Sequence, residues 1–497
     1  KDSEFFYLGA HDNHYENRLK DYNIKIKTLE LKLKYFGFRW WHLLKVKKEL
    51  LRQNIYKFDL IIDLQTKLRN TLILKKIPTD NFYSATYKFI FCSTKNNYSN
   101  TKNICEMTLS NLEKFLNIKI KRINYNLDNI DTALKKSFDK YQIYYSVKSN
   151  NNPNLLAFMH QHLPSLGVDC SSPGELLVAK KVGIPIKNCV YTGNFESIDD
   201  LQSAVDSGCE INLDDETSFK RLKNICIPEY ISFRLNPGVG KGRFAEIVTG
   251  GHDAKFGIPI EKIAAVYQSA LIDGVKTFGL QCHAGSAILD ENHFRENTEL
   301  ILKPARFIEN TIDQRLKKIS IGSGFGIPYT DDEDPLDFDN VFRMVAEVFK
   351  EFYGQHQDDW PILCIEPGRA IVGDAGILLA RVTGIKDSYK KFVGLDAGME
   401  TLMRPALYGV VHRIYKVGDP IGEQNITVDV TGRICENTDR LAVDIPFPNV
   451  MEGDLIAIMD TGAYGYAMSH QFNTRPRPAE LLIDKDELRL IRTRETI

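Results

Sequence analysis

The sequence predicts an α/β protein with three parts: a short α/β N-terminal segment, a (β/α)8 barrel of the TIM type, and a C-terminal β-sandwich or β-barrel domain. Three observations predict this. Short apolar runs of strand length alternate with amphipathic stretches of helix length through the middle of the chain. Polar and glycine residues gather directly after those runs. The charge balance also changes sharply near residue 120, which indicates a boundary.

The expected domains are residues 1–120, 121–370 and 371–497. Residues 1–120 carry 22 Lys and Arg against 12 Asp and Glu, whereas the remainder carries 42 against 53. The whole chain therefore has a net charge of -1, which argues against nucleic acid as its main partner.

The first segment has the pattern of a strand between two helices. Residues 43–52 have helical spacing, 58–64 form an apolar run of strand length, and 65–76 are again helical and stop before Pro78. The stretch "DLIIDLQ…LRN" resembles the N-terminal half of lipopolysaccharide heptosyltransferases. No counterpart of the nucleotide-sugar half follows, so a glycosyltransferase is disfavoured and the segment is expected to be a non-catalytic fragment.

Eight apolar runs after residue 128 are expected to be the barrel strands. Helices are expected between them, for example over 153–162, 173–182 and 260–271. Eight βα units in about 240 residues suit a closed barrel, and an open doubly wound sheet is the alternative. The eight predicted strands are Ile143–Val147, Gly167–Cys170, Cys189–Thr192, Glu210–Leu213, Tyr230–Leu235, Thr277–Cys282, Lys318–Ile321 and Pro361–Ile365.

The residues that end these strands predict one joint site, because barrel chemistry lies at the carboxyl ends of the strands. The first strand ends in Lys148, whose amine could take an aldehyde if burial lowers its pKa. The sixth ends in His283, and the seventh runs into the glycine-rich loop 322–326, which could cradle a phosphate. The eighth ends in Glu366 and Arg369. Together these groups suit pyridoxal phosphate.

Residues 124–484 resemble the barrel-type pyridoxal-phosphate decarboxylases of basic amino acids, most closely the diaminopimelate decarboxylases. The barrel motifs are "YYSVKSN" (144–150), "SSPGEL" (171–176), "RLNPGVG" (234–240), "KFGI" (255–258), "CHAGS" (282–286), "GSGFGIPY" (322–329) and "EPGR" (366–369). The later motifs are "DAGMETLMRPALYG" (396–409), "CENTD" (435–439) and "GAYGYAMSHQFNTRPRPAE" (462–480).

The resemblance assigns the cofactor contacts. Lys148 would hold the pyridoxal aldehyde covalently, His283 would stack on the ring, and Glu366 would pair with the ring nitrogen. The phosphate would be bound by residues of three segments, with Arg369 nearby: Ser286, Gly324, Gly326 and Tyr464. Ser323 interrupts the usual triple glycine of this loop.

The resemblance also assigns the substrate contacts. Arg404 and Tyr408 would bind a substrate carboxylate, and Arg369 and Tyr464 would share in substrate binding. Cys435 and Glu436 would come from the neighbouring subunit of a homodimer. That cysteine would assist reprotonation of the substrate carbon, and the glutamate would bind the distal ammonium.

Runs of β type follow the barrel, at 378–383, 391–395, 425–430 and 454–459. In the family a strand just before the barrel joins this domain. Here "INYNLDNI" (123–130) resembles the end of that strand, and the preceding segment does not match.

Composition sets the remaining expectations. No run approaches the ~18 apolar residues of a membrane span. Nine cysteines without C-x-x-C pairs predict neither a disulfide framework nor a metal site, and a reducing, cytoplasmic compartment is expected.

The predicted function is the decarboxylation of meso-2,6-diaminopimelate to L-lysine and CO2, the last step of lysine biosynthesis. A sibling decarboxylase acting on carboxynorspermidine, ornithine or lysine is the alternative. A catalytically dead homologue that still binds the cofactor is disfavoured because every main catalytic position is filled.

Overall fold

The computed structural model describes residues 5–7, 26–28, 42–52, 55–63, 68–84, 89, 91–93, 126–242, 249–330, 332–418, 426–484 and 487–496. The chain divides into two compact units. One comprises Lys1–Ile123 with Gly418–Ile421, and the other comprises Asn124–Val417 with Gly422–Ile497.

The first unit contains a parallel strand pair joined through a helix, the connection that parallel strands require. Its helices His42–Arg52 and Leu68–Leu74 and its strand Phe58–Asp63 lie within three residues of the predicted elements. Its other strands, Phe5–Tyr7, Ile26–Thr28 and Thr79–Ser84, were not predicted. Val46 and Leu50 of the first helix pack against Ile73 and Ile77. The elements are β1 (Phe5–Tyr7), β2 (Ile26–Thr28), α2 (His42–Arg52), β3 (Phe58–Asp63), α3 (Leu68–Leu74) and β4 (Thr79–Ser84).

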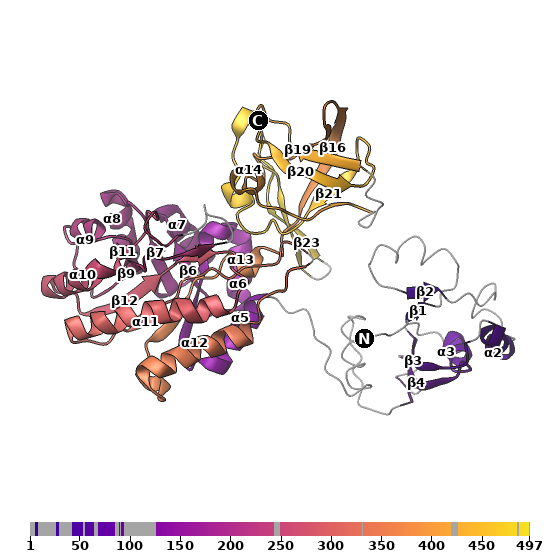
Figure 1. The fold of residues 1–497 in the computed structure, drawn as a ribbon, viewed down its shortest axis with the longest axis horizontal. Helices are drawn as coiled ribbons and strands as arrows, with labels where there is room; N and C mark the ends of the chain where they lie inside the picture. The colour runs from indigo at the N-terminus through magenta and orange to yellow at the C-terminus, as the bar shows by residue number, and fades with distance from the viewer. Residues whose placement is uncertain are drawn as a thin grey trace. The chain divides into compact units, whose positions relative to one another are not determined.

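Eight parallel strands close into a barrel in the second unit (Figure 1). Each strand pairs with the next one in the chain, and the last pairs with the first, with Ile365 opposite Ile143. The predicted (β/α)8 barrel is therefore confirmed and the open sheet is excluded. The strands are β5 (Tyr141–Ser146), β6 (Gly167–Cys170), β7 (Cys189–Thr192), β8 (Glu210–Leu213), β9 (Tyr230–Asn236), β12 (Thr277–Cys282), β14 (Lys318–Ser320) and β15 (Ile362–Ile365).

Helices surround this barrel (Figure 1). The predicted helices over 153–162 and 173–182 have those bounds, and the third extends two residues further. The helices are α5 (Asn126–Ser137), α6 (Pro153–His162), α7 (Pro173–Val182), α8 (Ile198–Ser207), α9 (Glu216–Leu222), α10 (Ile260–Asp273), α11 (Asn292–Ile312), α12 (Phe338–Tyr353) and α13 (Arg369–Val372).

Local capping sets where the helices nearest the site begin. The Asn152 side chain accepts a hydrogen bond from the Asn154 N–H at 3.0 Å and starts α6. Ser172 accepts from the Glu175 N–H at 3.3 Å and starts α7. A proline stands in the first turn of both helices, where its missing N–H costs nothing. The loops after β5 and β6 are therefore short, and each ends at a capped helix.

The C-terminal part of the second unit is rich in β-structure. Its main sheet has the order β18-β21-β16-β17-β19-β20, and a separate hairpin joins β22 to β23. Buried aliphatic side chains such as Val393, Val430 and Ile456 form its core. The elements are β16 (Leu378–Asp387), β17 (Lys391–Leu395), α14 (Arg404–Tyr408), β18 (Ile414–Lys416), β19 (Ile426–Thr431), β20 (Arg440–Phe447), β21 (Leu455–Ile458), β22 (Glu480–Asp484) and β23 (Glu487–Arg492).

Two expectations need correction. The residues expected to end a strand before the barrel, 126–130, instead form the start of α5, because Leu127 and Ile130 pack into the barrel core with helical spacing; residues 123–125 lie outside the described part. In the C-terminal domain, strands β18, β20, β22 and β23 were not predicted. Short elements complete the unit: β10 (Lys241–Gly242), β11 (Ile258–Pro259), β13 (Gly285–Ser286), η1 (Val147–Ser149), η2 (Ile186–Asn188), η4 (Gln357–Asp359), η5 (Tyr466–Met468) and η6 (Phe472–Thr474).

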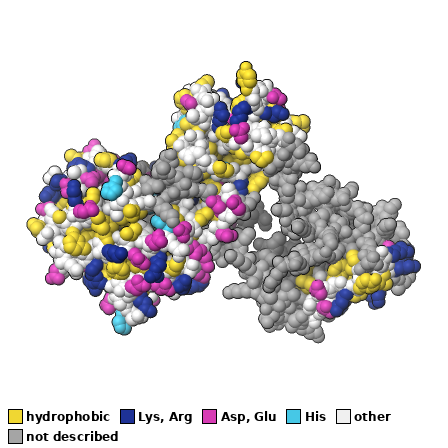
Figure 2. Space-filling view, in the orientation of Figure 1, with side chains coloured by type: hydrophobic (Ala, Val, Ile, Leu, Met, Phe, Trp, Pro, Cys, Tyr) yellow, Lys and Arg dark blue, Asp and Glu magenta, His cyan; other side chains and the backbone are white. Residues whose placement is uncertain are grey.

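Figure 2 shows acidic and basic side chains interspersed on the barrel face that carries α11 and α12. Arg295 of α11 pairs there with Glu299 and with Glu347 and Glu351 of α12. Within the described residues, no helix combines the length and the apolar character that crossing a membrane requires.

Candidate active site

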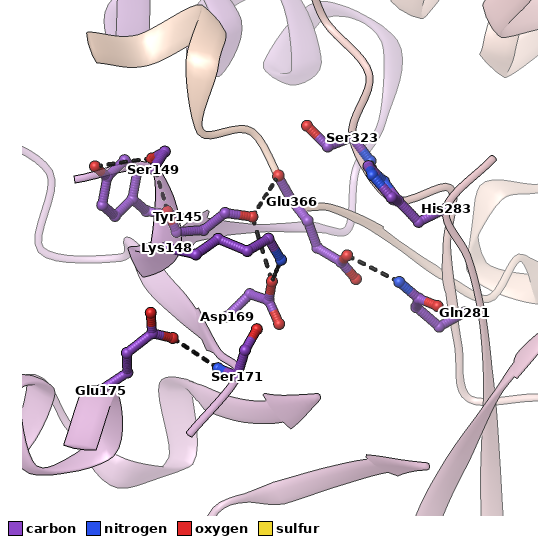
Figure 3. A network of polar contacts seen from close by, with 12 residues as sticks. Tyr145, Lys148, Ser149, Asp169, Ser171, Glu175, Gln281, His283, Ser323 and Glu366 are labelled. Atoms are coloured by element: carbon purple, nitrogen blue, oxygen red, sulfur yellow. Dashed lines mark hydrogen bonds and ion pairs between the residues drawn. The ribbon is translucent and has the colours of Figure 1, made fainter. Parts of the chain in front are cut away.

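Lys148 lies just beyond the end of β5, in the short helix η1 rather than in the strand itself. Its Nζ is 2.8 Å from Oδ2 of Asp169, which lies one residue before the end of β6 and is fully buried (Figure 3). The lysine side chain is 41% exposed. A flexible amine thus reaches from the barrel rim to a buried carboxylate.

The pKa of Lys148 is not lowered as the sequence suggested. Burial by itself would lower it, but the negative charges of Asp169 and Glu366 and the hydrogen bond to Asp169 raise the pKa above its usual range. Desolvation alone predicts a lowered pKa, and the carboxylate of Asp169 reverses that direction.

Glu366 follows β15 and is buried, and its carboxylate faces Gln281 near the Lys148 amine (Figure 3). The Gln281 amide donates to its Oε2 at 2.9 Å, and the Ser320 hydroxyl donates to its Oε1 at 2.6 Å. Burial and the nearby Asp169 charge raise the pKa of Glu366 from its ordinary 4.5 to about 7. The group is therefore balanced between its two protonation states near neutral pH.

The His283 ring follows β12 and faces the same site (Figure 3). Its Nδ1 accepts a hydrogen bond from the Ser323 N–H at 3.1 Å. Burial and the positive charges of Arg234 and Lys148 hold the pKa of His283 well below its usual range. The ring is thus neutral, and the backbone of Ser323, not its side chain, makes the contact.

The glycine-rich loop after β14 packs tightly against the loop after β12. A Cβ on Gly322 would lie 2.3 Å from the Cys282 carbonyl oxygen, and one on Gly326 would lie 2.9 Å from the carbonyl carbon of Ala287. Gly324 has φ +108, which side chains other than glycine rarely adopt. Glycine at these positions lets two backbones approach closely.

Arg369 connects this loop region to the C-terminal domain. Its Nη2 donates to the Ser286 hydroxyl at 3.4 Å and its Nη1 to the Tyr329 hydroxyl at 2.6 Å. The guanidinium carbon lies 4.9 Å from the centre of the Tyr464 ring. Tyr464 itself has a left-handed backbone (φ 57), and its N–H donates to the Ser149 carbonyl at 2.7 Å.

A second guanidinium, Arg404 of α14, is 2% exposed and stacks 5.0 Å from the centre of the Tyr329 ring. Its Nη1 lies 3.3 Å from Nε2 of His412. Tyr408, at the end of the same helix, packs against a cluster that includes Tyr329 and Val410. Both buried arginines therefore meet at Tyr329.

Cys435 and Glu436 lie apart from this group. The Cys435 N–H donates to the Asn473 side chain at 2.7 Å, and Glu436 accepts from the Thr438 N–H at 3.3 Å. Glu436 also lines an open pocket of about 540 Å³ between strands of the C-terminal domain. Among the described residues, neither Cys435 nor Glu436 forms a hydrogen bond or ion pair with Lys148.

The structure brings together most of the predicted residues: Lys148, His283, Ser286, Gly324, Gly326, Glu366, Arg369, Arg404, Tyr408 and Tyr464. Other residues hold these groups in place. Asp169 lies at the end of the predicted strand Gly167–Cys170, but its pairing with Lys148 was not predicted. Tyr329 ends the motif "GSGFGIPY" without an assigned role, and three further residues lie outside the motifs: Gln281, Ser320 and His412.

Residues 125–373 match the family model described as pyridoxal-dependent decarboxylase, pyridoxal binding domain. The chain is 40% identical over 377 residues to the diaminopimelate decarboxylase of Methanothermobacter thermautotrophicus, which covers 76% of this chain and 87% of that protein. It is 39% identical to that of Thermoplasma acidophilum over 73% of this chain and 86% of that protein. The crystal structure of diaminopimelate decarboxylase from Helicobacter pylori complexed with L-lysine is similar with a TM-score of 0.67 and 30% identity, covering 78% of this chain and 97% of that chain.

Proposed function

This chain belongs to the pyridoxal-dependent decarboxylases, and we propose that it converts meso-2,6-diaminopimelate to L-lysine and CO2, the last step of lysine biosynthesis. The proposal has two supports. The relatives named above are diaminopimelate decarboxylases at 30–40% identity over most of the chain. The site also holds a buried arginine with neutral partners, which suits a substrate with a second carboxylate.

The residues around Lys148 fit pyridoxal 5′-phosphate. Three buried polar atoms there have no hydrogen-bond partner within the described part of the chain: Oδ1 of Asp169, Oε1 of Gln281 and Nε of Arg369. An amine, a neutral ring, a buried carboxylate and a close-packed glycine loop surround one space. Unsatisfied buried polar atoms are costly in a folded protein, so a polar ligand among them is expected.

When bound, this cofactor supplies a ring that accepts the electron pair left on the substrate carbon as CO2 departs. Glu366 would hold a proton between its carboxylate and the ring nitrogen. Its pKa of about 7 suits a group that must share a proton at neutral pH. A neutral residue at position 366 would remove this electrostatic stabilisation.

Lys148 would bind the cofactor aldehyde covalently, and Asp169 would receive the released amine. The Asp169 contact keeps the lysine protonated whenever it is free. His283 would pack its neutral ring on the cofactor, held in orientation by the Ser323 N–H. A neutral ring is required there because a charged one would repel the protonated cofactor ring.

Ser286, Gly324, Gly326 and Tyr464 would hold the phosphate, with the Arg369 guanidinium beside them. Arg404 and Tyr408 would bind the carboxylate that the product keeps, with Arg369 and Tyr464 sharing in substrate binding. Neither Arg369 nor Arg404 forms an ion pair with a carboxylate of the described residues, so both keep a full positive charge for anions.

A homodimer would complete the site. Cys435 and Glu436 have no contact with Lys148 within one chain, which suits delivery to a partner's site. Cys435 would assist reprotonation of the substrate carbon and Glu436 would bind the distal ammonium. A cysteine thiol beside the reacting carbon can return the proton that the product needs.

A reducing, cytoplasmic compartment suits the cysteines. All eight in the described part of the chain are free, as expected where thiols are kept reduced. For residues 1–120 we propose a non-catalytic heptosyltransferase-like fragment, supported by its β3-α3-β4 parallel unit.

The test is CO2 release by purified protein loaded with pyridoxal phosphate. Diaminopimelate, ornithine, lysine and carboxynorspermidine are compared, with Lys148→Ala as the control that loses both turnover and the absorbance of bound cofactor. Release from diaminopimelate alone is the expected result. CO2 release from another substrate instead would assign the chain to a sibling decarboxylase. Absence of CO2 release from all four substrates would contradict enzymatic function.

A further inference from the structure

Arg404 is a buried cation that is held only by neutral groups among the described residues. The Tyr329 ring lies against its guanidinium, and the His412 imidazole lies 3.3 Å from its Nη1. A carboxylate in the same place would hold the guanidinium more strongly, but it would also cancel the charge that an incoming anion needs.

The hydrogen bonds of His412 determine which of its nitrogens carries the proton. Its Nδ1 lies 2.8 Å from the Met459 carbonyl oxygen, which can only accept, so Nδ1 carries the hydrogen. Nε2 of the neutral ring is then a lone-pair acceptor that points at Arg404. The ring is 3% exposed, and its plane is at 85° to Tyr329, with the two centres 5.4 Å apart.

The charges around His412 keep it in this state. Burial and the positive charges of Arg404 and Arg369 lower the pKa of His412 to about 4, and only the Met459 carbonyl opposes them. A protonated imidazole would present an N–H to Arg404 and repel it. The neutral acceptor is therefore maintained throughout the working pH range of an enzyme.

We infer that His412 is a positioning residue that orients the Arg404 guanidinium toward the substrate carboxylate without neutralising it. This inference rests on the proposed function, because it assumes that Arg404 binds the carboxylate that remains in the product. His412 itself would touch neither substrate nor cofactor. Its effect should therefore appear in the affinity for carboxylate-bearing ligands.

The test compares His412→Leu, which has no acceptor, with His412→Gln, whose amide oxygen can accept from Arg404 while its NH2 donates to Met459. Binding of L-lysine to the cofactor-loaded protein is measured by calorimetry. Inhibition by cadaverine, the diamine without a carboxylate, is measured in parallel. Loss of one hydrogen bond to a charged group predicts about tenfold to hundredfold weaker lysine binding for the leucine variant.

The expected pattern is a loss confined to carboxylate recognition. In His412→Leu, lysine affinity falls and KM for diaminopimelate rises much more than kcat changes, whereas cadaverine inhibition is kept. His412→Gln restores most of the lysine affinity. His162→Leu, the same substitution at a histidine that pairs with Asp128 outside the site, leaves lysine binding unchanged.

A double variant adds an independent measurement. If His412 acts through Arg404, then His412→Leu causes no further loss of lysine affinity in an Arg404→Lys background. Equal losses for lysine and cadaverine, failure of the glutamine variant to restore binding, or additive losses in the double variant would each overturn the inference. Failure of the wild-type protein to release CO2 from diaminopimelate would instead overturn the proposed function.

Discussion

The carboxyl group of Glu366 lies inside the barrel and accepts hydrogen bonds from two neutral side chains, Gln281 and Ser320. Burial and the Asp169 charge make its ionised form costly in the cofactor-free protein, which is why its pKa rises. The cost disappears when a positive group lies against it. The ionised side chain of Glu366 thus destabilises the cofactor-free protein, and we expect it to stabilise the cofactor-bound protein.

The pH dependence of stability should report this cost. Between pH 4.5 and about 7 the unfolded chain has released the Glu366 proton while the folded protein still holds it. The free energy of unfolding of cofactor-free protein therefore falls as pH rises through this window, by about 1.4 kcal/mol for each unit of pKa difference. Glu366→Gln removes that contribution.

Melting temperatures of the cofactor-free wild type and Glu366→Gln at pH 5 and pH 7.5 check this. The wild type is expected to lose more stability than the variant over that interval. Parallel changes in the two proteins would contradict the assignment of the raised pKa to Glu366.

At the residue scale, the groups that we propose to bind the cofactor could be predicted because they end strands or occupy long motifs. The groups that orient them were missed for a physical reason. Gln281 and Ser320 act through hydrogen bonds to Glu366, which lies far from both in the chain, and no local pattern encodes such partners. His412 lies close to Arg404 in the chain, but its other hydrogen bond, to the Met459 carbonyl, is long-range. The predicted direction of the Lys148 pKa was wrong for the same reason, since its partner Asp169 comes from the neighbouring strand, β6.

At the element scale, the loop that carries Lys148 is held by the C-terminal part of the chain. The Asn150 side chain donates to the Gly462 carbonyl at 3.1 Å, and that of Asn152 donates to Glu480 at 2.7 Å. Arg492 of β23 pairs with Glu480 and donates to the Asn151 side chain at 3.3 Å. The hairpin β22–β23 therefore fixes the loop that follows the lysine.

Arg492→Met should loosen this loop. Breaking a partly buried charge pair leaves Glu480 without its cation, at a cost of about 1–3 kcal/mol. We expect faster loss of bound cofactor, measured by absorbance after gel filtration, with a lower melting temperature. Arg489→Met is the matched control, because Arg489 lies on the same strand and its ion pairs with described residues, Asp484 and Glu487, stay within the hairpin. Equal effects of the two variants would contradict the role of the hairpin.

The element predictions succeeded where apolar runs were bounded by clear turn or cap residues. All eight barrel strands were found, since buried parallel strands read as short continuous apolar runs. β18, β20, β22 and β23 were missed because most of their side chains are partly or fully exposed and none contains an apolar run longer than three residues. Residues 126–130 were expected to end a strand because "INYNLDNI" (123–130) resembles the end of a strand in the family. The helical spacing of Leu127 and Ile130 was the better guide.

At the scale of the whole molecule, the described active-site residues lie within the second compact unit. A protein that starts at Asn124 should therefore keep its kcat/KM for diaminopimelate. Steady-state CO2 release by the full chain and the shortened protein checks this. A shortened protein that melts normally but has lost turnover would show that residues 1–123 contribute to catalysis, contrary to the expectation.

The contact between Arg492 and Asn151 spans 341 positions of the chain. At the usual rate of synthesis of 5–20 residues per second, the ribosome needs about 17–70 s to travel that distance. Until then the emerged lysine loop lacks its complete set of C-terminal partners, of which Arg492 is made last, after Gly462 and Glu480. Before these contacts form, a nascent barrel would bind pyridoxal phosphate only weakly. Tight binding of the cofactor should therefore follow the completion of translation.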